Sequence, residues 1–270
     1  MNHTTIWTYH ARGEPSRPPV VFLHGFMGAG ADWLPLAENY ANRFFCLMPD
    51  LPGHGRNIHL SLARPLDFES VANGLNLFLE QLNLNRVSLV GYSLGGRIAL
   101  YAALKFPQKI RALVLESCHA GIVDEQARRE RAEADDRQAE AVLAHGLETF
   151  VERWYEMDLF RTLQSQPQLL AEIKEKRKKN DLHWVAKTLK ELSPGRQPPL
   201  WAKLGALPMQ VLLIAGTLDT KYVELATKMS QQIPRARVEV IPGVGHNVHL
   251  EHPGQFAEVV SAFLAGDVAT

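Results

Sequence analysis

The sequence has few cysteines, no excess of charge of either sign and no long apolar run. The two cysteines, Cys46 and Cys118, each follow an apolar run, which favours buried thiols over a disulfide and fits a reducing compartment. Lysine plus arginine equals aspartate plus glutamate, at 29 residues each, so no overall field favours nucleic acid or an anionic membrane. No stretch reaches the length of a membrane span, and residues 1–5 lack a basic segment followed by an apolar one. We therefore expect a cytoplasmic monomer or small homo-oligomer, with no nucleic-acid or membrane partner.

Glycine is also nearly absent from one part of the chain, residues 124–190, where charged and helix-forming residues dominate. A proline-rich stretch follows at 193–200. On both sides of this region apolar runs alternate with helical patterns, which is typical of a mostly parallel, doubly wound sheet with right-handed crossovers. We predict an α/β protein with a core formed by residues 1–119 and 206–270, and a helical cap inserted at 120–205.

Short apolar runs predict the strands, and amphipathic stretches predict the helices that connect them. The expected strands are 6–10, 20–23, 44–48, 87–91, 110–115, 211–215 and 238–241. The expected core helices are 32–42, 68–82, 94–106, 223–233 and 253–264. Asp32 is a suitable N-cap for the first of these helices.

The strand at 87–91 and the helix from Leu94 are joined by Gly91-Tyr92-Ser93-Leu94-Gly95. The two glycines of this G-x-S-x-G pattern let neighbouring backbone pass close to the turn. Such a turn lifts the serine hydroxyl to the top of the sheet, where the helix N-terminus favours developing negative charge. An ordinary serine in a glycine-rich connection is the alternative. The flanking strand and helix favour Ser93 as a reactive residue.

A serine hydroxyl becomes reactive at neutral pH when a histidine lies within hydrogen-bond reach and a carboxylate orients that histidine. In this kind of fold the partners follow late strands in the order serine, aspartate, histidine. Asp219 follows the strand at 211–215, and His246 follows the strand at 238–241 among glycines. We therefore predict a catalytic triad of Ser93, Asp219 and His246.

Two other polar residues, Asp50 and His54, have suitable side chains but precede Ser93 and lie in a tight turn, so we predict structural roles for them. In the geometry typical of the fold, backbone N–H groups stabilise an oxyanion beside the serine. The expected donors are Phe26, in an early glycine-rich loop, and Leu94. The glycines around Phe26 permit this arrangement.

Several short motifs, in this order, resemble those of α/β-hydrolase-fold proteins over roughly residues 19–265. They are HGF at 24–26, DLPGHG at 50–55, GYSLGG at 91–96, GTLD at 216–219 and GVGH at 243–246. The resemblance implies the fold and agrees with the triad.

A narrower set of motifs resembles the 2-succinyl-6-hydroxy-2,4-cyclohexadiene-1-carboxylate synthase family. The set is Arg97 directly after GYSLGG, ESCHAG at 116–121, the arginine-rich segment 128–137, Trp154-Tyr155 and Phe160. This resemblance implies a lyase of menaquinone biosynthesis that abstracts a proton and expels pyruvate. It also implies a small anionic substrate with several carboxylates and no metal or organic cofactor.

Arg97 supports the narrower resemblance on physical grounds. It lies four residues after Ser93, so it shares the serine's helix face one turn on. A guanidinium there suits a substrate with carboxylates, which it binds in a bidentate fork. The resemblance implies that Arg131 and Arg177 are further carboxylate ligands, although each lies in a charged run that also fits a solvated helix face.

Aromatic residues are further candidates for substrate contacts. Trp154, Tyr155 and Phe160 either line the pocket or pack the cap on the sheet, since aromatics dominate both kinds of surface. Tyr92 takes the place of the histidine common in esterases, which disfavours a generic esterase. Lys221 is also a candidate, although Tyr222 stands where the family pattern has phenylalanine, and this leaves the pair open.

Two other functions remain open, because a fold and a triad do not settle a reaction. The first is an esterase or carbon–carbon bond hydrolase that uses Ser93 as a nucleophile. Ester turnover far above that of Ser93→Ala would favour it. The second is a hydrolase-fold protein that binds a small ligand; the intact triad argues against it, and tight binding without turnover would support it.

Overall fold

A computed structural model describes residues 7–268 and contains one seven-stranded sheet. Its strands are β1 (Tyr9–Arg12), β2 (Pro19–Leu23), β3 (Phe45–Pro49), β4 (Val87–Tyr92), β5 (Ile110–Glu116), β6 (Gln210–Gly216) and β7 (Ala236–Ile241). The strand order is β1-β3-β2-β4-β5-β6-β7, and only the pairing of β1 with β3 is antiparallel. The mostly parallel, doubly wound sheet expected from the sequence is therefore confirmed.

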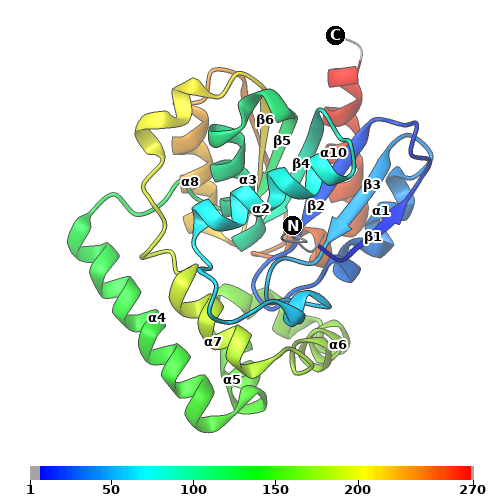
Figure 1. Ribbon diagram of the computed structural model, residues 1–270. Coiled ribbons are helices and arrows are strands. Elements are labelled where there is room, and N and C mark those ends of the chain that lie inside the picture. The colour runs from blue at the N-terminus through cyan, green and yellow to red at the C-terminus, as the bar shows by residue number, and fades with distance from the viewer. Residues whose placement is uncertain (1–6, 269–270) are drawn as a thin grey trace.

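Helices cover both faces of the sheet (Figure 1). One face carries α2 (Phe68–Gln81), α3 (Leu94–Lys105) and α8 (Thr220–Ser230), and the other carries α1 (Leu34–Tyr40), α9 (Val248–Glu251) and α10 (Pro253–Val268). Along β2, Val21 and Leu23 join the first hydrophobic cluster, whereas Val20 and Phe22 join the second. Because successive side chains of a strand point to opposite faces, a strand covered on both faces has a continuous apolar sequence.

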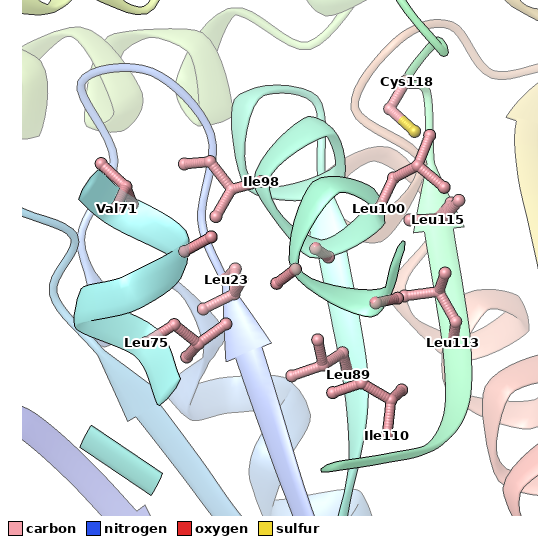
Figure 2. Packing of buried hydrophobic residues seen from close by; sticks show 14 of the residues in the cluster. Leu23, Val71, Leu75, Leu89, Ile98, Leu100, Ile110, Leu113, Leu115 and Cys118 are labelled. Atoms are coloured by element: carbon pink, nitrogen blue, oxygen red, sulfur yellow. The ribbon is translucent and has the colours of Figure 1, made fainter. Parts of the chain in front are cut away.

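The first of these clusters fixes α2 and α3 on the central strands. Figure 2 shows Leu75 of α2 and Ile98 of α3 lying between their helices and the sheet, with Leu23 and Leu89 on the strands below. All four side chains are buried, at 1% exposure or less. Burial of a leucine or isoleucine contributes about 1.5–3 kcal/mol, so this packing holds the start of α3, and with it Ser93, at one position on the sheet.

Between β5 and β6 the chain leaves the sheet and forms a helical segment, residues 125–191, on one side of it (Figure 1). Its helices are α4 (Glu125–His145), α5 (Leu147–Tyr155), the 3-10 helix Asp158–Ser165, α6 (Pro167–Arg177) and α7 (Leu182–Glu191). A third hydrophobic cluster joins these helices to each other and to Met27 of the sheet domain. The cap boundaries at 120 and 205 remain predictions.

Short 3-10 helices complete the secondary structure at Gly30–Trp33, Asn57–His59, Pro107–Lys109 and Trp201–Ala206. Cys46 and Cys118 are free and buried, as expected, and burial raises the pKa of each thiol to about 12. Within residues 7–268, no helix has the length and apolar character needed to cross a membrane.

The structure corrects the start of the chain. The strand expected at 6–10 is observed as Tyr9–Arg12, half-buried against β3; Trp7 and Thr8 lie outside it, and Ile6 lies outside the described residues. The helix expected at 32–42 is divided into a 3-10 turn and α1, because Pro35 favours the first turn of a new helix. Asp32 is therefore not the N-cap of α1. Its carboxylate instead accepts a hydrogen bond from the N–H of Ala29, at 3.1 Å.

Candidate active site

Ser93 occupies a strained turn between β4 and α3. Its φ of 50° and ψ of −108° are rare for a residue other than glycine, and such strain occurs mainly at functional sites. The turn is held because the N–H of Ser93 donates to the carbonyl oxygen of Glu116 at 2.9 Å. A Cβ at Gly91 would lie 2.6 Å from the carbonyl oxygen of Gly95, and one at Gly95 would lie 2.2 Å from that of Leu23. Both glycines of the motif are thus required by close backbone approach.

The loops after β6 and β7 bring Asp219 and His246 to Ser93. His246 Nε2 lies 3.2 Å from Ser93 Oγ, and His246 Nδ1 lies 2.7 Å from Asp219 Oδ2. Since a carboxylate can only accept, the Nδ1–H donates to Asp219 and Nε2 is left to accept from the serine hydroxyl. His246 is 1% exposed, so its imidazole is shielded from water. This geometry suits removal of the serine proton by the histidine.

A buried pair fixes the loop that carries His246. The backbone N–H of His249 donates to Glu116 Oε1 at 3.0 Å, and its ring Nδ1 lies 2.8 Å from Glu116 Oε2. Glu116 ends β5 and is fully buried. At the end of α9, Glu251 accepts from the N–H groups of Gly245 and Asn247 in this loop, at 2.9 and 3.2 Å. Two carboxylates therefore set the backbone on either side of His246.

Tyr92 packs directly against this histidine. Its ring makes edge contacts with His246 and His249, at centroid distances of 5.5 and 4.8 Å. A Cβ at Gly25 would lie 2.6 Å from Tyr92 Cε1, so the early glycine loop makes room for the ring. Burial, with Glu116 nearby, raises the pKa of Tyr92 well above its usual value. The phenol remains a proton donor at neutral pH.

The loop after β2 is held by His24, in the HGF motif. Its Nδ1–H donates to the carbonyl oxygen of Gly25 at 2.8 Å, and its Nε2 accepts from the N–H of Leu51 at 2.9 Å. Because Nε2 accepts a hydrogen bond, the ring is neutral, and burial lowers its pKa in the same sense. Asp50 accepts from the N–H of Gly30 at 2.7 Å, and the His54 ring lies 5.1 Å from that of His24. Asp50 and His54 are thus turn residues, as expected.

The expected oxyanion donors, Phe26 and Leu94, both belong to segments next to the serine. Leu94 is the first residue of α3, and the first N–H groups of a helix have no acceptor within the helix. Phe26 follows Gly25 and lines the cavities beside Ser93. Their role as oxyanion donors remains a prediction.

Ser93 lies between two cavities that share Phe26, Trp154 and Leu159 in their walls. The smaller, of about 50 Å³, is called the histidine cavity below; among the expected contacts it is lined by Tyr92, Tyr155, Phe160 and Arg177. The larger, of about 230 Å³, is called the arginine cavity; it is lined by Arg97, Arg131 and Lys221, together with Tyr222. Every residue expected to contact substrate therefore lines one of the two.

Two of the three expected carboxylate-binding arginines already have carboxylate partners. Arg177 lies 2.7 Å from Asp32 Oδ2, and both side chains are largely buried, so Arg177 does not lie on a solvated face. Burial opposes its charge, but Asp32 and the hydroxyl of Tyr155 raise its pKa above the usual value. Arg131 Nε lies 2.9 Å from Asp135 Oδ2.

Arg97 differs from both. Its Nη1 donates to the carbonyl oxygen of Leu192 at 3.1 Å and to Gln197 Oε1 at 3.4 Å. Within residues 7–268 it forms no ion pair, although it is only 8% exposed. Burial lowers its pKa to about 10, so it stays charged at neutral pH. Lys221, exposed at the rim, also has no carboxylate partner in the described part of the chain. The arginine cavity therefore carries uncompensated positive charge.

Three further residues of this cavity or its support were not singled out in the sequence. His119 and Thr188 line the cavity, and Gln197 Nε2 donates to the carbonyl oxygen of His119 at 3.1 Å. His119 lies in the ESCHAG motif just after β5, and side chains that follow neighbouring parallel strands gather at one edge of a sheet. That position could have identified His119 from the sequence. Thr188 and Gln197 lie in helical and proline-rich stretches where no sequence pattern points to a cavity residue.

Comparison with known proteins agrees with this geometry. Residues 18–253 match the family described as the alpha/beta hydrolase fold. The chain is 36% identical to the putative 2-succinyl-6-hydroxy-2,4-cyclohexadiene-1-carboxylate synthase of Bacillus subtilis, over 93% of this chain and 92% of that protein. It is also 36% identical to the chloroplastic protein PHYLLO of Arabidopsis thaliana, over 94% of this chain but only 16% of that longer protein. The solved structure of MenH from S. aureus superposes with a TM-score of 0.92 at 30% identity, covering 97% of this chain and 99% of that one.

Proposed function

The chain belongs to the alpha/beta hydrolase fold family, and from that premise we propose that it is a lyase of menaquinone biosynthesis. In the proposed reaction it eliminates pyruvate from 2-succinyl-5-enolpyruvyl-6-hydroxy-3-cyclohexene-1-carboxylate. The product is 2-succinyl-6-hydroxy-2,4-cyclohexadiene-1-carboxylate, the compound named in the curated relatives. The similarity to those synthases runs over nearly the whole length of both chains, which supports this assignment over another activity of the fold.

The observation that carries the proposal is a complete Ser93–His246–Asp219 hydrogen-bonded chain beside a buried arginine, Arg97, that has no carboxylate partner within residues 7–268. A guanidinium held out of water without a counterion favours an anionic ligand. An esterase for neutral substrates has no use for such a charge. The proposed substrate carries several carboxylates, so it supplies the missing counterion.

The proposed chemistry follows from what elimination requires. A carbon-bound proton is removed from the ring, a second ring double bond forms, and the bond to the enolpyruvyl oxygen breaks, so that enolpyruvate leaves and becomes pyruvate. His246 accepts the hydroxyl proton of Ser93, and the serine oxygen then acts as a small, fixed base toward the carbon-bound proton. The N–H groups of Phe26 and Leu94 stabilise negative charge on a substrate oxygen. No acyl group has to be carried by the enzyme.

Pyruvate release tests the proposal. The purified protein should release pyruvate from the enolpyruvyl substrate, and Ser93→Ala should reduce kcat/KM by at least about a thousandfold. A nitrophenyl ester is the comparison substrate. Ester turnover that depends on Ser93, with no pyruvate from the enolpyruvyl compound, would overturn the lyase proposal in favour of a hydrolase. Tight binding of that compound without turnover would favour a ligand-binding protein.

A further inference from the structure

We propose that His119 binds a carboxylate of the substrate in the arginine cavity, as a neutral N–H donor beside the charged Arg97. The inference rests on the proposed function only for the identity of the substrate; the anion-binding role itself can be tested with a simple dicarboxylate.

The tautomer of His119 follows from its backbone neighbour. The N–H of Gly121 donates to His119 Nδ1 at 3.0 Å. A neutral imidazole has one donor and one acceptor nitrogen, so when Nδ1 accepts, the proton lies on Nε2. Within residues 7–268, no group accepts a hydrogen bond from this Nε2–H, although the ring lines the arginine cavity and is only 8% exposed. Because the ring lines the cavity, this donor is available to an acceptor on a ligand.

The surroundings of His119 keep it neutral. Burial lowers its pKa well below the usual value, and the charges of Arg97, Lys221 and Arg131 act in the same direction. The ring therefore adds a hydrogen-bond donor to the cavity without adding a further charge. A carboxylate with two oxygens can accept from a guanidinium and from a neutral N–H at the same time.

His119 and Arg97 are held by one common residue. Gln197 is 1% exposed; its Oε1 accepts from Arg97 Nη1, and its Nε2 donates to the carbonyl oxygen of His119. The amide thus fixes the guanidinium relative to the loop that carries the imidazole. Such a fixed arrangement lowers the entropy lost when an anion binds both groups.

The wall of the same cavity has a second unsatisfied polar group. Thr188 is 2% exposed, and within residues 7–268 its Oγ1 has no hydrogen-bond partner. A threonine within a helix commonly donates to the carbonyl four residues earlier, but this hydroxyl does not. Buried polar atoms normally have partners, so this hydroxyl is an exception in the packing behind the cavity wall.

Two substitutions at His119 separate the hydrogen-bond donor at Nε2 from the structural contact at Nδ1. Asparagine reaches only as far as Nδ1, so His119→Asn keeps an acceptor for the N–H of Gly121 but loses the donor at Nε2. Glutamine reaches the Nε2 position, so His119→Gln restores a donor. Binding of succinate is measured by titration calorimetry, and KM and kcat are measured for the enolpyruvyl substrate. Arg97→Ala serves as the positive control for the cavity, and circular dichroism checks the fold.

We expect His119→Asn to weaken succinate binding and raise KM by about tenfold, the effect of losing one hydrogen bond to a charged group, with kcat within about twofold of wild type. His119→Gln should lie close to wild type. The proposal is overturned if His119→Asn binds succinate as wild type does, or if His119→Gln is as impaired as His119→Asn. If wild type and the two variants bind succinate as expected but wild type releases no pyruvate, the proposed reaction is refuted and this inference stands.

A measurement on the wild-type protein needs no substitution. In spectra of ¹⁵N-labelled histidine, His119 Nε2 should carry a proton in the free protein, and its resonance should shift as succinate is added. A proton on Nδ1, or a resonance unaffected by saturating succinate and by the substrate, would overturn the proposal even if the His119 variants failed to fold.

Discussion

The guanidinium of Arg177, at the end of α6, lies 2.7 Å from the carboxylate of Asp32, in the 3-10 turn before α1. This largely buried ion pair joins the helical segment 125–191 to the sheet domain beside the histidine cavity. It also makes that side of the site electrically balanced, whereas Arg97 leaves the arginine cavity with a net positive charge. The two sides of Ser93 therefore favour different parts of a substrate.

Replacing Asp32 by asparagine should strongly destabilise the protein. Arg177 would then be a buried charge without a counterion, which costs about 3–5 kcal/mol of the free energy of unfolding. The double variant Asp32→Asn/Arg177→Met removes both charges and should recover most of that loss. Urea unfolding at neutral pH measures both. Equal stability of Asp32→Asn and wild type would show that the pair is not buried in solution.

Removing members of the Ser93–His246–Asp219 chain should give losses that do not add. Ser93→Ala and His246→Ala should each lower kcat by about 10³-fold or more, because the three residues act as a unit. The double variant should lose little more than either single one. Steady-state pyruvate release gives the rates, and circular dichroism checks folding. Multiplicative losses in the double variant would show that the two residues act independently.

Arg97→Ala should weaken transition-state binding of the anionic substrate by about 2–4 kcal/mol, the range for truncating one partner of a buried charge pair. This loss is measured as a fall in kcat/KM. Arg97→Lys should rescue little, because an ammonium cannot form the bidentate fork. Arg129→Ala is the control, since Arg129 pairs with Glu125 on the exposed face of α4. An unchanged kcat/KM in Arg97→Ala would mean that the substrate does not reach this guanidinium.

Ser93 should remain unmodified during turnover if it acts as a base. Intact-mass spectra recorded in the steady state should show only the unmodified chain, and deuterium at the abstracted position should slow kcat/KM if proton removal limits it. A product burst together with a mass adduct on Ser93 is the signature of a covalent route. That result would favour the hydrolase alternative.

The stability of the protein should fall below about pH 6.5, in part because of His54. Burial lowers the pKa of His54 to about 3, so between pH 6.5 and 3 the unfolded chain binds a proton there that the folded chain does not. Unfolding therefore becomes more favourable as the pH falls, by about 1.4 kcal/mol per pH unit for this group. His54→Asn keeps a donor for the carbonyl oxygen of Pro52 and has no such proton.

Urea unfolding at about pH 7.5 and about pH 5 checks this effect. Between the two, wild type should lose roughly 2 kcal/mol more of its free energy of unfolding than His54→Asn, and above about pH 7 the two curves should run parallel. Equal losses in both proteins would mean that His54 is protonated in the folded state.

The sequence determined the sheet and the turn that carries Ser93 because both depend on local patterns. Strands β2, β4, β5 and β6 are covered on both faces, so each is mostly apolar and can be recognised without its neighbours. The G-x-S-x-G turn can be recognised in the same way. Its two glycines are required because backbone of the turn and of β2 comes too close to leave room for a Cβ. Asp219 and His246 could be selected because parallel strands bring their carboxyl ends to one edge.

Only the tertiary structure decided which charged groups are free and which are paired. The spacing from Ser93 set Arg97 apart in the sequence, but nothing in the sequence showed whether Arg97, Arg131 or Arg177 has a carboxylate partner. Their states depend on Gln197, Asp135 and Asp32. Gln197 lies 100 residues from Arg97 along the chain, and Asp32 lies in a different part of the fold from Arg177. Electrostatic interactions and burial act through space, and side-chain neighbours so distant in sequence are fixed only once the sheet and the helical segment have packed together.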